Sequence, residues 1–139
     1  MLVTQAERDG WVVVTVVGEM DLISSPAVRQ KVHDAVAEGR RSLVLDLADV
    51  RFCDSSGVGV LIGARRLMRS CAGRLRIVLP EDGPTGPDAS GGRDKGQSAG
   101  YGGEAHVNRV LAALGVRRLF EVFPDLEAAT DDTARPMSA

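Results

Sequence analysis

Two neighbouring serines, Ser55 and Ser56, stand where an apolar strand segment gives way to an apolar helix segment. Asp54 precedes them and Gly57 follows them. The first backbone N–H groups of a helix have no partner within it, and the positive end of the helix dipole lies there, so this place favours negative charge. A serine hydroxyl at such a place can cap the helix, attack a substrate or accept a phosphate group.

The residues alone leave capping and phosphorylation open. One hydroxyl is enough to cap a helix, and capping is an ordinary role for a serine there. If Ser56 is the cap, Ser55 lies one residue outside the helix with its hydroxyl in solvent, as a kinase would require. Asp54 also has an ordinary role, because an aspartate in a turn accepts hydrogen bonds from nearby backbone N–H groups. Nucleophilic catalysis is disfavoured, since no His or Lys lies nearby in the sequence to act as a base.

A second carboxylate is expected beside the first. Asp21 follows one predicted strand and Asp54 follows another. The carboxyl ends of neighbouring parallel strands lie at one edge of a sheet, and open α/β sheets meet their ligands and partners at that edge. The intervening residues from Gly18 to Ile23 are predicted to leave the strand. The candidate site therefore belongs at the carboxyl edge of the sheet.

The elements that hold these residues are predicted to alternate between strand and helix. Asp9-Gly10 is a strong turn signal and predicts a hairpin of residues 2–7 and 11–17. Ser24-Ser25-Pro26 predicts a helix start with a serine cap, and Gly39 predicts its end. The remaining predicted strands are 43–47, 75–79 and 119–123, and the remaining predicted helices are 58 to about 72, 107–114 and 124–129. This alternation implies right-handed crossovers and an α/β sheet that is covered by helices and at least partly parallel.

Neither a cofactor nor a metal is predicted from the motifs. Gly57 and Gly59 follow a strand but lack the further glycine of a dinucleotide-binding loop. We interpret these two and Gly63 as residues that let the helix pack close to the sheet. His33 and His106 are the only histidines, and neither has a cysteine or carboxylate at a metal-ligand spacing. We therefore predict no catalytic residue and no metal site.

The bulk properties of the chain limit its function class. Its 139 residues, 44% hydrophobic content and net charge of −2 are typical of one globular domain and disfavour a general binder of DNA or RNA. No apolar run reaches the roughly 18 residues of a membrane span. The N-terminus lacks the pattern of a signal peptide, so we expect a cytoplasmic protein. Cys53 and Cys71 would lie about 25 Å apart along one helix, too far for a disulfide.

One stretch of the chain cannot contribute to a core. Residues 81–105 contain no Val, Ile, Leu, Met or Phe and hold 8 of the chain's 16 glycines. Such a segment buries too little apolar surface to offset the entropy of ordering it, so we predict a flexible insert. The expected organisation is one domain over residues 1–129, interrupted by this insert, and a disordered tail over 130–139.

Three segments occur in an arrangement typical of one domain family. They are Gly18-Glu19-Met20-Asp21, Val44-Leu45-Asp46-Leu47 and Asp54-Ser55-Ser56-Gly57-Val58-Gly59-Val60-Leu61. Together they resemble the STAS domain and, more narrowly, the stand-alone anti-sigma-factor antagonists of bacteria. The resemblance runs from about Leu2 to Ala129 and is interrupted by the glycine-rich insert. It implies an α/β fold with a small mixed β-sheet and helices mainly on one face.

The resemblance also implies a function without catalysis. Members of this family bind an anti-sigma factor that is itself a serine kinase with a histidine-kinase-like ATPase fold, and this binding frees a sigma factor for transcription. The kinase phosphorylates the first serine of the pair, here Ser55, and a metal-dependent serine phosphatase reverses the modification. The residues implied to contact the partner are Glu19, Asp21, Asp54, Ser56 and Gly57.

Phosphorylation is expected to act on docking. A phosphate adds about −1.5 to −2 charge, so a phosphoserine beside Asp21 and Asp54 should weaken binding without changing the fold. One alternative is a STAS scaffold or oligomer component of a signalling complex in which Ser55 is never phosphorylated. Another is an enzyme with Ser55 or Asp54 as its nucleophile. Two features depart from the family pattern: the insert replaces a very short turn, and Cys53 beside the serines could add redox sensitivity.

Overall fold

The computed structural model of this protein describes residues 2–79 and 103–131. Within these residues the strands form one five-stranded sheet with the order β1-β2-β3-β4-β6. The strands are β1 (Leu2–Arg8), β2 (Trp11–Met20), β3 (Ser42–Cys53), β4 (Arg74–Val78) and β6 (Glu121–Phe123). β1 is antiparallel to β2, and the other neighbouring pairs are parallel. The small mixed sheet predicted from the sequence is confirmed.

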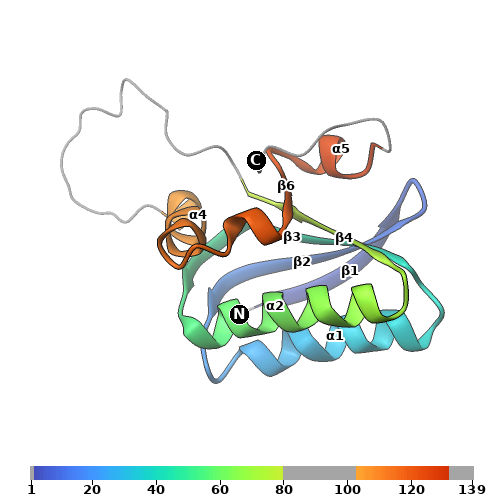
Figure 1. The fold of residues 1–139 in the computed structure, drawn as a ribbon, viewed down its shortest axis with the longest axis horizontal. Helices are drawn as coiled ribbons and strands as arrows, with labels where there is room; N and C mark the ends of the chain where they lie inside the picture. Colours follow the sequence, from blue (N-terminus) through green and yellow to red (C-terminus); the bar gives the residue numbers. More distant parts are fainter. Residues whose placement is uncertain (1, 80–102, 132–139) are drawn as a thin grey trace.

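Two long helices, α1 (Ser25–Ala37) and α2 (Ser55–Ser70), lie side by side on one face of this sheet (Figure 1). Each turns its apolar stripe towards the strands, because apolar residues spaced three and four apart fall on one side of a helix. Val28, Val32 and Ala35 of α1 are buried, as are Val60, Leu61, Ala64 and Met68 of α2. The expected covering of mainly one face by helices is confirmed.

Shorter segments complete the described chain. α4 (Gly103–Ala113) buries Val107 and Leu111 in the same core as the two long helices. A 3-10 turn (Arg117–Leu119) leads into β6, and α5 (Leu126–Ala129) follows it. No helix among residues 2–79 and 103–131 is both long and apolar enough to cross a membrane.

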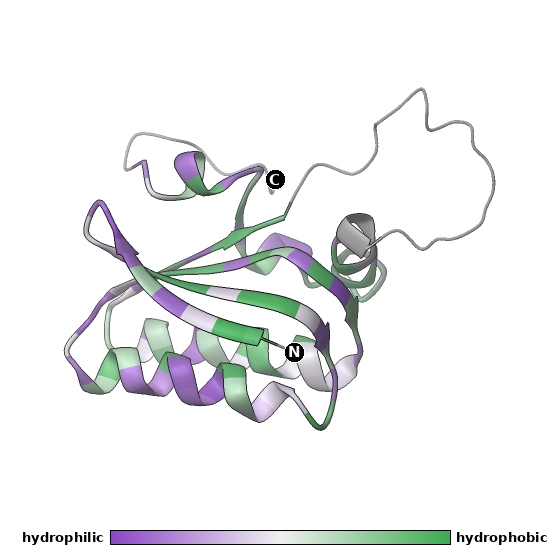
Figure 2. Ribbon diagram, turned by 180° about the vertical axis from the view of Figure 1, so that it is seen from behind, coloured by the Kyte–Doolittle hydropathy of each residue, from purple (hydrophilic) through white to green (hydrophobic). Residues whose placement is uncertain are grey.

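The strands have apolar side chains on both faces, and the core has two parts. Because side chains alternate along a strand, Val12, Val14 and Val16 of β2 face α1 and α2, whereas Trp11 and Val13 face the opposite side. Figure 2 shows apolar strands at the centre of the molecule and hydrophilic segments on the outer sides of the helices. The second, smaller cluster includes Val44, Val78, Phe123 and Ala129, and so joins α5 to the sheet.

Arg76 ties the end of the described chain to this smaller cluster. Only 6% of Arg76 is exposed, and its guanidinium lies 4.6 Å from the ring centre of Trp11 and 4.7 Å from that of Phe123. Its Nη1 donates hydrogen bonds to the carbonyl oxygens of Ala129 (3.0 Å) and Asp131 (2.9 Å). A buried guanidinium requires such partners, because an unpaired buried charge is strongly unfavourable.

Two strands are longer than predicted, and this changes the geometry of the site. β2 continues through Gly18, Glu19 and Met20, which pair with the second half of the twelve-residue strand β3. The prediction that the chain leaves the strand at Gly18 is wrong. Gly18 has a φ of 116°, and the register between the two strands shifts on either side of it. The irregularity is a bulge that the partner strand bridges, which a local sequence pattern does not reveal.

Other boundaries differ by less. The turn at Asp9-Gly10 is confirmed, with φ values of 53° and 86° that suit a tight hairpin. α4 begins at Gly103 instead of residue 107. Thr130, placed in the disordered tail by prediction, is only 4% exposed and accepts a hydrogen bond from Arg8 Nε. The predicted insert lies almost wholly outside the described residues, and so does the tail beyond residue 131.

Candidate functional site

The site lies where β2 and β3 end side by side. Met20 and Cys53 are the last paired residues of these strands, and the backbone N–H of Asp54 donates to the carbonyl oxygen of Met20 at 3.2 Å. Asp21 and Asp54 come directly after this pair. The expectation that both carboxylates lie at the carboxyl edge of the sheet is confirmed.

Asp54 is the residue that caps α2. Its Oδ1 accepts hydrogen bonds from the backbone N–H groups of Ser56 (2.8 Å) and Gly57 (3.2 Å), while its own backbone is extended. The alternative in which Ser56 caps the helix is wrong, because the carboxylate already holds those N–H groups. Ser55 is consequently the first residue of the helix and does not lie one step outside it.

Ser55 combines exposure with a fixed backbone. The residue is exposed, whereas Asp54 and Ser56 are half-buried and Gly57 is buried. Within residues 2–79 and 103–131 no group forms a hydrogen bond with the Ser55 hydroxyl. Its backbone is held by the helix and by the cap, so the hydroxyl is presented to solvent from a rigid place. A transferable group could reach it without any change in the strand or the helix.

Gly57 lets the start of α2 approach the sheet. A Cβ at this position would lie 2.7 Å from the Sγ of Cys53 and 2.9 Å from both Cβ and the carbonyl oxygen of Met20. Any other residue would push the helix away from the strand ends. The prediction of close packing is thus confirmed for Gly57. It is wrong for Gly59 and Gly63, where a Cβ would meet nothing within 4 Å.

Asp21 organises the turn between β2 and α1. Its Oδ1 accepts hydrogen bonds from the backbone N–H groups of Ser24 (2.9 Å) and Ile23 (3.1 Å). The backbone hydrogen bond from Ser24, followed by that residue's hydroxyl, lowers the pKa of the Asp21 carboxyl below its ordinary value of 3.8. Asp21 is therefore ionised at neutral pH and fixed in place.

Ser24 and Glu19 complete this turn. The Ser24 hydroxyl donates to the carbonyl oxygen of Glu19 at 2.6 Å and accepts from the backbone N–H of Asp21 at 3.0 Å. The predicted serine cap is wrong, because Ser24 makes no capping bond to α1 and its side chain turns back towards the strand. Glu19 itself is exposed. Sequence reasoning missed the role of Ser24 because the capping pattern Ser-Ser-Pro suited a helix start equally well.

Cys53 is a packing residue at the base of the site. It is only 2% exposed, and burial, with a smaller effect from the neighbouring Asp54 charge, raises the pKa of its thiol to about 12. The reactive form of a cysteine is the thiolate, so this group is poorly suited to redox chemistry. Cys53 and Cys71 are both free thiols, as the spacing predicted.

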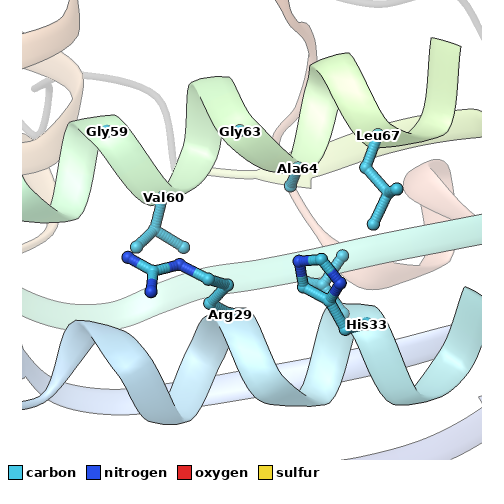
Figure 3. A pocket seen from close by; sticks show the side chains of 8 residues that line it. Arg29, His33, Gly59, Val60, Gly63, Ala64 and Leu67 are labelled. Atoms are coloured by element: carbon cyan, nitrogen blue, oxygen red, sulfur yellow. The ribbon is translucent and has the colours of Figure 1, made fainter. Parts of the chain in front are cut away.

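A shallow groove runs between α1 and α2 on the side away from the sheet (Figure 3). Its volume is about 70 Å³, and Arg29 and His33 of α1 face Gly59, Val60, Gly63 and Leu67 of α2 across it. Ser55 and Gly59 lie one helical turn apart, so this groove begins close to the serine. In the described ranges 2–79 and 103–131, no three His, Cys, Asp or Glu side chains are grouped so that they could hold a metal ion.

Comparisons with known sequences indicate one family. A family model described as the STAS domain matches residues 3–84. The anti-sigma-B factor antagonist of Bacillus subtilis is 33% identical over 75 residues, which are 54% of this chain and 66% of that protein. The anti-sigma-F factor antagonist RsfB of Mycobacterium tuberculosis is 37% identical over 59 residues, which are 42% of this chain and 48% of that protein. The matching stretch thus spans between about half and two thirds of the length of these relatives.

Solved structures share the fold. An anti-sigma factor antagonist from Mycobacterium paratuberculosis superposes with a TM-score of 0.69 at 23% identity, covering 92% of this chain and 89% of that one. The Bacillus cell fate determinant SpoIIAA in its phosphorylated form superposes with a TM-score of 0.58 at 22% identity, covering 91% of this chain and 96% of that one. At these identities the likeness concerns the arrangement of strands and helices.

Proposed function

This chain belongs to the STAS domain family, and we propose that it is an anti-sigma-factor antagonist whose docking is switched off by phosphorylation of Ser55. Curated relatives at 33% and 37% identity carry the name of anti-sigma factor antagonists, which supports the general role. The proposed partner is an anti-sigma factor with serine kinase activity, and a serine phosphatase would restore the binding form. The protein itself performs no catalysis in this scheme.

The observation that carries the proposal is the division of roles between Asp54 and Ser55. Asp54 satisfies the N–H groups of Ser56 and Gly57, so the helix start is stable without either serine hydroxyl. Ser55 then has no structural task for its side chain. An exposed hydroxyl on a rigid helix start, with a carboxylate beside it, suits a phosphate acceptor.

The effect of a phosphate follows from its charge. A phosphoserine carries about −1.5 to −2 charge at neutral pH. Because Asp54 already occupies the first N–H groups of α2, the phosphate of Ser55 would remain at the surface beside this carboxylate. A partner that docks here would have to desolvate both charges. A tenfold loss of affinity requires only about 1.4 kcal/mol, and one added dianion next to a carboxylate can supply it.

Transfer of phosphate can be tested by intact mass. The chain is incubated with ATP and, one at a time, with the ATPase-fold anti-sigma kinases encoded in the same genome. We expect one added phosphate on the wild-type chain, none on Ser55→Ala, and one on the matched control Ser56→Ala. A phosphate on Ser56, or no phosphate with any of these kinases, would contradict the proposal.

Binding assays separate the proposal from the scaffold alternative. We expect Ser55→Ala to capture the anti-sigma factor and Ser55→Glu to capture much less of it. Equal capture by both variants would indicate a STAS scaffold in which Ser55 is not a switch.

A further inference from the structure

Leu22 and Ile23 are two large apolar side chains in water at the edge of the site. They occupy the turn between β2 and α1, with 71% and 86% of their surface exposed. Single exposed apolar residues are common on protein surfaces, and they need no special explanation. Two in succession are different, because contact between apolar surface and water is unfavourable and no residue within 2–79 or 103–131 covers Leu22 and Ile23.

The backbone that carries this pair is fixed. The Asp21 carboxylate holds the N–H groups of Ile23 and Ser24, and the carbonyl oxygen of Asp21 accepts from Ser25 N at 2.9 Å. The Ser24 hydroxyl ties the other end of the turn to Glu19. A partner that covers Leu22 and Ile23 would therefore not have to order the loop first, and avoiding that entropy loss favours tight binding.

The turn lies next to the start of α2. Asp54 donates to Met20, the residue before Asp21, and Gly57 packs against the Cβ of Met20. Figures 1 and 2 both show the turn between β2 and α1 beside the first turn of α2. A protein surface that covers Ser55 can thus cover this turn in the same contact.

We propose that Leu22 and Ile23 are the apolar anchor through which the anti-sigma factor binds this chain, an inference that rests on the proposed function. Three acidic residues belong to the same edge of the sheet: Asp21 directly precedes the anchor, Glu19 stands near the end of β2, and Asp54 follows Cys53, the last paired residue of β3. The matching surface of the partner is an apolar pocket with cationic side chains around it. Asp21 holds the turn, Leu22 and Ile23 fill the pocket, and Ser55 carries the removable charge.

The test compares two exposed apolar sites. The double variant Leu22→Ser/Ile23→Ser removes the anchor, and Leu119→Ser is the matched control. Leu119 is 38% exposed and lies beside Met68 and Arg69. Its carbonyl oxygen accepts a hydrogen bond from Arg65 Nε at 2.8 Å, and Arg65 lies about 15 Å beyond Ser55 along α2. Binding to the anti-sigma kinase that phosphorylates the wild-type chain is measured by calorimetry, and thermal unfolding of each variant is measured in parallel.

We expect the double variant to bind at least tenfold more weakly, since a few apolar residues buried at an interface dominate its binding energy. The control should bind within about twofold of wild type. Both variants should unfold at the wild-type temperature. Equal affinity of the double variant and wild type would overturn the anchor and leave the phosphorylation switch intact. If the double variant lost only self-association, as judged by sedimentation, the pair would belong to a contact between two copies and the anchor would again be overturned. Failure of the wild-type chain to bind any such kinase would refute the proposed function and the anchor together.

Discussion

Asp54 determines what Ser55 is free to do. A helix start needs an acceptor for its first N–H groups, and here a carboxylate supplies it one residue before the serines. Sequence reasoning reserved the cap for one of the two serines and gave Asp54 only a role in the turn, although Asp and Ser serve about equally well as caps. Only the structure identifies the cap, because the backbone N–H groups of Ser56 and Gly57 donate hydrogen bonds to Oδ1 of Asp54.

Substitutions at Asp54 measure how much this cap contributes to the free energy of unfolding. We expect Asp54→Ala to lower the free energy of unfolding by about 1 kcal/mol, the usual contribution of an N-cap side chain. Asp54→Asn keeps an acceptor oxygen and should stay near wild type, and so should Ser56→Ala. Urea titration of the three variants gives the comparison. A larger loss in Ser56→Ala than in Asp54→Ala would contradict the assignment.

The carboxylate of Asp21 makes stability depend on pH. Its pKa in the folded chain lies below the ordinary value of 3.8 because backbone N–H groups and the Ser24 hydroxyl stabilise its ionised form. A group whose pKa is lowered by folding stabilises the fold above its unfolded-state pKa, and this stabilisation disappears as the pH falls through the folded-state pKa.

We therefore expect the stability advantage of wild type over Asp21→Asn to be constant between about pH 5 and pH 7 and to shrink below about pH 4, where the unfolded carboxyl begins to bind protons. Chemical denaturation of both proteins at several pH values measures this difference in the free energy of unfolding. An advantage that stayed the same down to pH 3 would mean that the charge of Asp21 is not involved.

Helix α2 carries three glycines with two different tasks. Gly57 faces Cys53 and Met20 at distances that no Cβ tolerates, whereas Gly63 faces open space in the groove beside α1. Sequence reasoning assigned the same task to both, because periodicity locates a glycine on a helix but does not reveal how close the neighbouring strand comes. Only the register of β2 against β3 brings Met20 to Gly57.

The two glycines should respond oppositely to alanine. We expect Gly57→Ala to lower the free energy of unfolding by about 1–3 kcal/mol, because the added methyl group has to displace the strand ends. Gly63→Ala should raise it by up to about 1 kcal/mol, since alanine favours a helix and the space is open. Thermal and urea unfolding of both variants provide the measurement. If both variants changed the free energy of unfolding in the same direction, the difference in packing between Gly57 and Gly63 would be contradicted.

The strands at the site illustrate where local patterns fail. The continuous apolar run of β2 predicted the strand, but Gly18 and Glu19 broke the pattern and predicted its end. In the folded chain the second half of β3 supplies partners for Gly18, Glu19 and Met20, and pairing across 32–33 residues of sequence overrides the local signal. The prediction of a serine cap on α1 failed for a similar reason, because the Ser24 hydroxyl accepts from the backbone N–H of Asp21 and donates to the carbonyl oxygen of Glu19.

The arrangement of the whole molecule was accessible from the sequence. Alternating elements, the hairpin at Asp9-Gly10 and the apolar stripes of the helices fixed a mixed sheet with its carboxyl edge at Asp21 and Asp54. These signals are strong because burial of apolar area drives both the periodicity and the fold. The exposed pair Leu22 and Ile23 gave no such signal, since exposure depends on what the rest of the chain leaves uncovered.

A rigid fold of this kind makes phosphorylation a local event. The core beneath α1 and α2 does not include Ser55, and the cap at Asp54 holds α2 whether or not the serine is modified. We expect the phosphorylated and unmodified chains to have the same circular dichroism spectrum, because the phosphate enters no buried region.

The affinity of the two forms for the anti-sigma kinase decides the matter. The chain phosphorylated on Ser55 and the unmodified chain are titrated against the same kinase in the presence of a non-hydrolysable ATP analogue, with phosphatase-treated protein as the control. The phosphorylated form should bind at least tenfold more weakly, a difference of about 1.4 kcal/mol, and phosphatase treatment should restore the affinity. Equal affinities of the phosphorylated and unmodified chains would show that the charge on Ser55 does not control docking.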